Sequence, residues 1–334
     1  MKYRFETKVY RRELTAPLQT AHGQWSVREG VLLRLEDGDG RVGFGEIAPL
    51  PDFSTEGLKA AVDLLESWGG VYDSGGRTRI PPGFPCTEMA LWSAEQFLLE
   101  PEAEERVYPV AGLLPSGGGA IERLEQLCDE GFRSFKWKVG VHPREQEFGW
   151  LNRLLEGLPP RGRLRLDANA GLDWEDFTAW LDYLEGVPQI EYFEEPVGPE
   201  DRPRLQETAR TRGIQVALDE SVSQVDSLLK ALLSGWTGLL VIKPGIIGSP
   251  LQYVQWQAGW ERDFVFSSVF ETSVGLENAL RLIGGISDPE RVRPLGFGTR
   301  HFFPADGLNL HSGGPQLQAG VVGIEAMEEI WKDL

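Results

Sequence analysis

The residues with the clearest potential for chemistry are acids and lysines that each end a short apolar run. Leu164–Asn169 reads Leu-Arg-Leu-Asp-Ala-Asn, Ile190–Pro196 reads Ile-Glu-Tyr-Phe-Glu-Glu-Pro, and Val216–Ser221 reads Val-Ala-Leu-Asp-Glu-Ser. On either side of this group, Phe135–Lys138 and Leu239–Lys243 are apolar runs that end in lysine. A short apolar run predicts a buried strand, so the charged residue at its end would lie at the mouth of the fold.

Three carboxylates, Asp167, Glu194 and Asp219, end the three central runs. Brought together in a dry site without a counter-charge, they would repel one another strongly. A hard divalent cation resolves this repulsion, and Mg²⁺ takes oxygen ligands of this kind. No His or Cys accompanies the three acids, which argues against zinc. The sequence therefore predicts Mg²⁺ as the cofactor.

Lysines flank the acids in chain order, with Lys136 and Lys138 before them and Lys243 after them. In a closed ring of strands the two sides would face each other across the metal. A partly desolvated lysine near a divalent cation has a lowered pKa and becomes a usable base near neutral pH. A metal with a lysine predicts abstraction of a proton next to a carboxylate, with the cation stabilising the enediolate.

The elements that must position these residues alternate between strands and helices. Strands are predicted near Val107–Leu113, Ser134–Val139, Arg163–Ala168, Gln189–Glu194, Gln215–Asp219, Gly238–Lys243, Asp263–Ser267 and Pro294–Gly298. Helical patterns lie between them at Ala120–Glu130, Pro143–Glu156, Trp174–Leu184, Pro203–Arg212 and Ser223–Ser234. This alternation predicts an α/β fold built from parallel βαβ units.

The spacing of the strand ends favours a closed barrel over an open sheet. From Lys138 to Ser267 they recur every 24 to 29 residues, which fits one βα unit. A doubly wound sheet could show the same spacing, but it would spread the six ends along an edge. A barrel brings them to one point.

The first hundred residues have a different character. Gly30–Glu36 and Arg41–Ile47 predict a hairpin around the turn residues 37–40. Ala16–Trp25 and Ala48–Ser54 are predicted loops, and helices are expected at Thr55–Trp68 and Thr87–Leu99. The last stretch leaves the βα rhythm and is expected to return to this N-terminal part. We therefore predict domain ranges of 1–102, 103–301 and 302–334.

Composition limits the partners. The chain of 334 residues has 33 basic and 51 acidic residues and a formal net charge of −18. This acidity argues against a nucleic acid partner, whose phosphates need Lys and Arg. No apolar stretch is long enough to span a membrane. Two distant cysteines and an N-terminus without a signal-peptide pattern lead us to expect a cytoplasmic protein.

The Lys-x-Lys pair, the three acids and Lys243, in this order, resemble the muconate-lactonising-enzyme subgroup of the enolase superfamily. The resemblance covers nearly the whole chain. It implies a modified TIM barrel, (β/α)7β, with an N-terminal α+β capping domain that the C-terminal segment completes. It also implies Asp167, Glu194 and Asp219 as Mg²⁺ ligands and Lys138 as the acid/base.

Within the subgroup, three stretches resemble the o-succinylbenzoate synthase family: Leu164–Asn169, Val241–Ser249 and Ser267–Gly275. That family implies a carbon–oxygen lyase of menaquinone or phylloquinone biosynthesis. Its reaction is the Mg²⁺-dependent syn dehydration of 2-succinyl-6-hydroxy-2,4-cyclohexadiene-1-carboxylate through an enediolate. Lys138 would remove the proton and then protonate the departing hydroxyl, while Lys243 would act as a cation on the opposite face.

The small-molecule carboxylate substrate needs further contacts, for which the candidates are Lys136, Arg165, Asn169, Ser267, Ser268 and His22. Arg165 could contact the substrate carboxylate or pair with a neighbouring acid. Asn169 could cap the following helix, the serines could simply be small residues at a crowded barrel end, and His22 could be an ordinary loop residue. The loops Thr20–Trp25 and Ala48–Ser54 are expected to close the barrel mouth.

Two other functions stay open. An N-acylamino acid racemase or dipeptide epimerase of the same subgroup would use the same catalytic residues. Gly296–Arg300 lacks the Asp-x-Asp pair that dipeptide epimerases carry there, which counts against a dipeptide but not against an acylamino acid. The other alternative is a catalytically idle binding protein on the same fold. The sequence does not give the oligomeric state.

Overall fold

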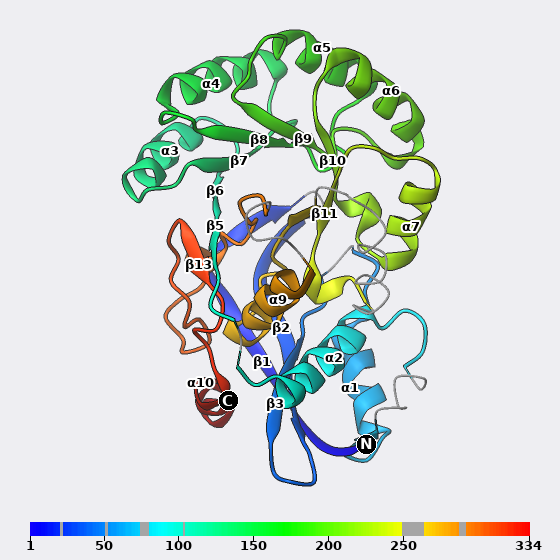
Figure 1. Cartoon of the computed structure of the whole chain (residues 1–334). Coiled ribbons are helices and arrows are strands. Elements are labelled where there is room, and N and C mark those ends of the chain that lie inside the picture. The colour runs from blue at the N-terminus through cyan, green and yellow to red at the C-terminus, as the bar shows by residue number, and fades with distance from the viewer. Residues whose placement is uncertain (21–22, 51–52, 74–79, 103, 249–263, 287–291) are drawn as a thin grey trace.

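The computed structural model describes residues 1–334 except 21–22, 51–52, 74–79, 103, 249–263 and 287–291. Figure 1 shows two parts. A cap that contains both chain termini lies below, and a curved array of strands with helices α3 to α7 along its outer side lies above. No helix in the described ranges is long and apolar enough to cross a membrane.

The cap is an antiparallel sheet packed with helices. Its strands are β1 (Lys2–Thr20), β2 (Gly23–Glu36), β3 (Val42–Ile47) and β4 (Val71–Asp73), in the spatial order β3-β2-β1-β4. Helix α1 (Leu58–Glu66) lies between β3 and β4 in the chain, and helix α2 (Pro85–Leu99) follows β4.

The hairpin predicted at Gly30–Glu36 and Arg41–Ile47 is confirmed, since β2 pairs with β3 from Val31↔Ile47 to Glu36↔Val42. The loop predicted at Ala16–Trp25 is wrong. Leu18 pairs with Trp25 after a shift in register, so β1 and β2 continue as one long hairpin. Pairing between strands outweighed the local turn signals in this stretch.

The second part is a barrel of parallel strands. They are β6 (Ala111–Leu114), β7 (Ser134–Lys138), β8 (Arg163–Asp167), β9 (Ile190–Glu194), β10 (Val216–Leu218), β11 (Leu239–Ile242) and β12 (Phe264–Phe266). They lie side by side in chain order. The bridges Val110↔Leu295 and Ser267↔Gly296 join the two edges. The predicted (β/α)7β barrel is thus confirmed, with an eighth strand reduced to one bridge on each side.

Helices alternate with the barrel strands as predicted. They are α3 (Gly119–Asp129), α4 (Arg144–Gly157), α5 (Trp174–Tyr183), α6 (Arg202–Arg212), α7 (Val225–Leu233) and α9 (Ser273–Ile286). Single 3₁₀ turns lie at Pro199–Asp201, Glu220–Val222, Pro244–Ile246 and Arg300–Phe302.

The strand predicted at Val107–Leu113 is two strands in different sheets. Its first half, β5 (Val107–Pro109), pairs antiparallel with β13 (Gln316–Gln318). The chain then ends in α10 (Ile324–Asp333), whose buried residues share a core with the cap residues Tyr10, Leu32 and Phe44. The C-terminal segment therefore completes the cap, as predicted. The boundaries at residues 102 and 301 stay predictions.

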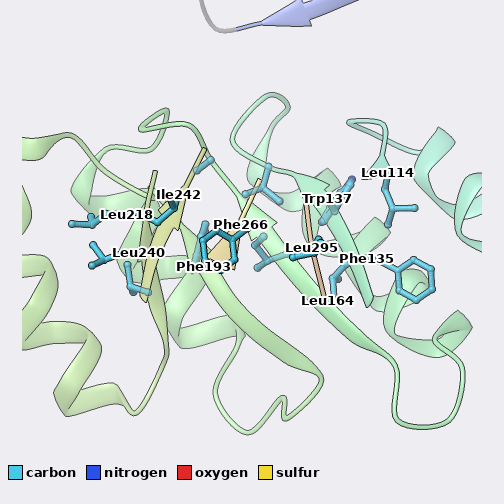
Figure 2. Packing of buried hydrophobic residues seen from close by; sticks show 14 of the residues in the cluster. Leu114, Phe135, Trp137, Leu164, Phe193, Leu218, Leu240, Ile242, Phe266 and Leu295 are labelled. Atoms are coloured by element: carbon cyan, nitrogen blue, oxygen red, sulfur yellow. The ribbon is translucent and has the colours of Figure 1, made fainter. Parts of the chain in front are cut away.

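The barrel strands separate apolar from charged residues by alternation. Figure 2 shows a large apolar cluster along neighbouring strands, and its labelled members are Leu114, Phe135, Trp137, Leu164, Phe193, Leu218, Leu240, Ile242, Phe266 and Leu295. The intervening residues point to the other face. There a small cluster of Tyr192, Ala217, Leu239, Val241 and Val265 lies beneath the strand ends.

Candidate active site

Alternation places the predicted catalytic residues on the inner face of the barrel. Lys136 and Lys138 alternate with the outward Phe135 and Trp137 on β7. Lys138 stands beside Asp167 in the β7–β8 register, and Asp167 stands beside Glu194 in the β8–β9 register.

Asp219 and Lys243 follow β10 and β11 directly. They lie two residues beyond Ala217 and Val241, which belong to the inner cluster. Lys138, Asp167, Glu194, Asp219 and Lys243 thus lie at one end of one ring, and Lys136 lies two residues deeper.

The three carboxylates are buried, with exposed fractions of 6% for Asp167, 1% for Glu194 and 4% for Asp219. The Nζ of Lys136 lies 2.7 Å from Asp167 Oδ2 and 2.6 Å from Glu194 Oε1. Burial lowers the pKa of Lys136, but Asp167, Glu194 and Asp219 together raise it well above the ordinary value. Lys136 is therefore a cation that bridges two of the acids.

The acids themselves respond differently to burial. Burial raises the pKa of Glu194 well above its ordinary value, although Lys136 opposes the rise. Burial also acts to raise the pKa of Asp219, but the neighbouring Lys243 and Lys136 lower it below the ordinary value. Glu194 further lowers the pKa of Asp219, so the electrostatic coupling runs across the acids.

Lys243 ends this series of coupled groups. It is 7% exposed, and its Nζ donates to Asp219 Oδ1. The same Nζ lies 4.6 Å from the ring centroid of Phe53, a residue of the predicted cap loop. The Phe53 carbonyl accepts hydrogen bonds from Ser223 and Gln224 of the barrel. The Phe53 end of this cap loop therefore lies over the barrel mouth, as expected from the sequence.

Lys138 differs from the other two lysines. It has no hydrogen bond or ion pair with any residue that the structure describes, and it is partly exposed. Its strand β7 and the Lys243 strand β11 are separated by β8, β9 and β10 in the sheet order. In an eight-stranded ring, that separation places the two lysines on opposite sides. The ring therefore has the partly exposed Lys138 facing the buried Lys243, with the carboxylates between them.

The donor set suits Mg²⁺, which prefers oxygen ligands. Asp167, Glu194 and Asp219 offer carboxylate oxygens from adjacent strand ends, and the ammonium of Lys136 already lies between two of them. Within the described ranges, no three Asp, Glu, His or Cys side chains are grouped as the ligands of one ion. The Lys136 ammonium therefore supplies the counter-charge of these acids in this structure.

A second layer of acids lies beside the candidate ligands. Glu195 Oε2 accepts hydrogen bonds from the Asp219 amide at 2.7 Å and from the Ser221 hydroxyl at 3.0 Å. Asn169 donates to Glu220 at 2.8 Å, and burial together with Asp219 and Asp167 raises the pKa of Glu220 to about 8. Sequence reasoning missed Glu195 and Glu220, although each directly follows a candidate ligand.

Arg165 is not placed as a substrate contact. It is fully buried, and its Nε lies 2.7 Å from Glu191 Oε2 while its Nη1 donates to the Pro294 carbonyl at 2.8 Å. The guanidinium also lies over the ring of Tyr192. Of the two alternatives for Arg165, the structure shows pairing with a neighbouring acid, two residues deeper in the barrel than Asp167, and a substrate contact stays a prediction.

The segment after β12 carries the two candidate serines. Ser268 is buried, and its hydroxyl donates to Glu271 Oε2 at 3.0 Å and lies 3.2 Å from the Thr299 hydroxyl. Ser267 bridges to Gly296 of the eighth strand position. Burial raises the pKa of Glu271 to about 7. His22 lies outside the described residues.

Comparison with known proteins agrees with this arrangement. The family model "Enolase C-terminal domain-like" matches residues 119–256, and "MenC, N-terminal domain" matches residues 6–96. A curated o-succinylbenzoate synthase of Thermosynechococcus vestitus is 35% identical over 88% of this chain and 92% of its own length. One of Yersinia enterocolitica is 35% identical over 78% of this chain and 80% of its own length.

Comparison with solved structures agrees with the family and the fold. The o-succinylbenzoate synthase of Thermosynechococcus elongatus, complexed with Mg in the active site, has a TM-score of 0.87 at 33% identity and covers 99% of this chain and 100% of its own. The L-Ala-D/L-Glu epimerase of Bacillus subtilis reaches 0.81 at 18% identity, covering 96% and 97%, which shows the shared fold alone. The chain belongs to the o-succinylbenzoate synthase family of the enolase superfamily.

Proposed function

We propose that the protein dehydrates 2-succinyl-6-hydroxy-2,4-cyclohexadiene-1-carboxylate to o-succinylbenzoate, as a carbon–oxygen lyase. One observation carries this proposal. Lys138 has no partner in the described part of the chain and lies across the ring from Lys243, with Asp167, Glu194 and Asp219 between them. One free base on one face of the substrate is the equipment that a syn elimination needs, because the proton and the hydroxyl leave from the same side.

The proposed reaction uses Lys138 twice. Its neutral amine takes the proton from the ring carbon that bears the carboxylate, and the electron pair of the broken C–H bond passes into the ring system. The C–O bond on the neighbouring carbon then breaks as the Lys138 ammonium protonates the leaving hydroxyl. Water departs, the ring becomes aromatic, and the amine is neutral again.

Asp167, Glu194 and Asp219 would hold the Mg²⁺, which supplies positive charge to stabilise the anion that develops on the substrate carboxylate. Lys243 would stay in place through its contact with Asp219. It would face the other side of the substrate ring as a fixed cation, as it now faces Phe53.

The cap would keep bulk water out of this reaction. Leu50 of the cap is buried in a cluster with Ile246 and Val269 from the loops after β11 and β12. Phe53 lies over Lys243 beside that cluster. A dry site strengthens each charge interaction inside it.

The proposal also covers the partners of the protein and its location in the cell. The net charge of −18 argues against a nucleic acid partner, and the small carboxylate substrate follows from the proposed reaction. Cys86 and Cys128 are both free thiols, which agrees with a cytoplasmic location.

Turnover of the cyclohexadiene carboxylate tests the proposal, measured as loss of diene absorbance with Mg²⁺ and with excess chelator. Metal-dependent loss is the expected result. No turnover by the metal-loaded protein would refute the proposal. Deuterium exchange into acylated amino acids would then identify a racemase, and silence in both assays would leave an idle binding protein.

A further inference from the structure

Arg28 is a buried cation in cap strand β2 that joins three separate segments. Its exposed fraction is 2%. The guanidinium donates to the Ala48 and Pro49 carbonyls, each at 2.6 Å, and to the Glu29 carbonyl at 3.0 Å. Its Nε donates to the Phe270 carbonyl at 3.2 Å. One side chain therefore links the cap loop after β3 to the barrel segment after β12.

The bonds of Arg28 are made to backbone carbonyls. It has no ion pair with any carboxylate that the structure describes. A buried charge without a counter-charge is costly unless its donors are satisfied, and here carbonyls of three segments satisfy them. The positions of these segments therefore stabilise the buried charge. The bonds from Arg28 in turn hold the segments in place.

The barrel end of this link is strained. Phe270 has a φ of 62°, a left-handed conformation that bulky residues rarely adopt. Its amide donates to the Ser268 hydroxyl at 2.8 Å, and its ring packs edge-on against Trp25 at 5.0 Å. Such strain persists where the surroundings over-determine it. Arg28 and Ser268 hold the two polar groups of this residue.

The segment Ser267–Thr272 holds the two serines that are candidates for substrate contact, and residues 48–50 lead to Phe53 over Lys243. We propose that Arg28 is a positioning residue for the proposed dehydration. It fixes Ser267–Thr272 and residues 48–50 in one arrangement over the barrel mouth. This inference rests on the proposed function, because it assigns those two segments to the substrate.

The kinetic test compares Arg28→Met with wild type. Loss of three bonds to two substrate-facing segments should raise the KM for the cyclohexadiene carboxylate about tenfold and lower kcat/KM by about 10- to 100-fold. The Mg²⁺ concentration for half-maximal rate should stay within about twofold, because the metal-binding acids stand on strands that Arg28 does not contact. Arg28→Lys keeps the charge and fewer bonds, so it should restore part of the loss.

Arg34→Met is the matched control. Arg34 lies on the same strand and pairs with Glu36 and Glu328, on the side of the cap that carries α10. Its kcat/KM should stay within about twofold of wild type. A drop in kcat for Arg28→Met with unchanged KM, equal to the fraction of protein that is unfolded, would mean a merely structural role and would overturn the inference.

Amide hydrogen exchange separates this inference from the proposed function. In the substrate-free protein, the peptide that contains Ser267–Thr272 should exchange at least about fivefold faster in Arg28→Met than in wild type, while peptides of β8 and β9 stay unchanged. Equal exchange in both proteins would overturn the positioning role, whether or not the wild type turns over substrate. Absence of wild-type turnover with faster exchange would refute the proposed function and leave the link intact.

Discussion

Glu46 of cap strand β3 is the other side chain that ties the cap to the segment before α9. Its carboxylate accepts the Tyr10 hydroxyl at 2.5 Å, the Thr272 amide at 3.0 Å and the Gly275 amide at 2.9 Å, and it also accepts the Thr272 hydroxyl. The Gly275 amide belongs to the first turn of α9, where helix amides have no partner within the helix, and Thr272 immediately precedes that helix. Glu46 thus caps a barrel helix from another domain.

Glu46→Ala leaves four buried donors without an acceptor. Each unsatisfied buried donor costs about 1 to 3 kcal/mol, so the low end for four donors gives a loss of roughly 4 kcal/mol in unfolding free energy. Typical domains have an unfolding free energy of roughly 5 to 15 kcal/mol, so this loss is a large part of it. Urea unfolding followed by tryptophan fluorescence measures it.

Glu29→Ala is the control for this measurement. Glu29 is a carboxylate on the neighbouring strand with a 54% exposed side chain, 3.8 Å from Arg11. Its removal should cost below about 0.5 kcal/mol. A Glu46→Ala loss of less than about 1 kcal/mol would refute the reasoning, since it would mean that water or rearrangement satisfies all four donors.

Three further predictions concern pH, the core of the barrel and the metal. The folded pKa of Glu271 is about 7, above its ordinary value of 4.5, so its contribution is present below pH 4.5 and is lost as pH rises to 7. Unfolding titrations should show wild type losing about 3 kcal/mol relative to Glu271→Gln over that window; parallel curves would contradict this. Arg165→Met should lower the unfolding free energy by about 3 kcal/mol, because it leaves the buried Glu191 carboxylate with less positive charge to compensate it. The control Arg163→Met, at an exposed position, should cost below about 0.5 kcal/mol. Equal losses would show that Arg165 is not a structural cation. Mg²⁺ at 100 times its dissociation constant should add about 2.7 kcal/mol to the unfolding free energy of the wild type in calorimetry. Glu194→Gln should lose most of this gain. An equal gain in both proteins would exclude Glu194 as a ligand.

The barrel and its inner charges were predictable because their signals are periodic. Strand alternation places Lys136, Lys138 and Asp167 on one face wherever the chain around them is apolar. The interval from each strand end to the next reflects the length of one βα unit. Both signals are local and repeat around the ring, so errors of a few residues at the strand ends did not change the order of the candidates.

What the sequence could not supply were partners that lie far away in the chain. Helix α9 is capped locally by the Thr272 hydroxyl, which accepts the Val274 amide, but it is also capped by Glu46 from 226 residues away. Arg28 reaches Phe270 across 242 residues. Alternation gave Arg165 the correct face, but it did not identify Glu191 as the acid with which Arg165 pairs, 26 residues away in the chain.

The loop predicted at Ala16–Trp25 and the single strand predicted at Val107–Leu113 are wrong for a similar reason. Leu18 and Trp25 pair across a hairpin whose stability comes from the rest of β1 and β2. The stretch 107–113 is apolar throughout, yet it changes sheet near Val110 because β13 arrives from the C-terminal segment to pair with its first half. In both cases pairing with another segment decided the structure.

The central claim is that Lys138 alone transfers the proton in both halves of the dehydration. The measurement that tests it most directly is kcat of Lys138→Ala with the cyclohexadiene carboxylate at saturating substrate and Mg²⁺. Loss of the acid and base should lower kcat by about 10⁴-fold, while Mg²⁺ still stabilises the variant as it does the wild type. A kcat within tenfold of wild type would contradict the account.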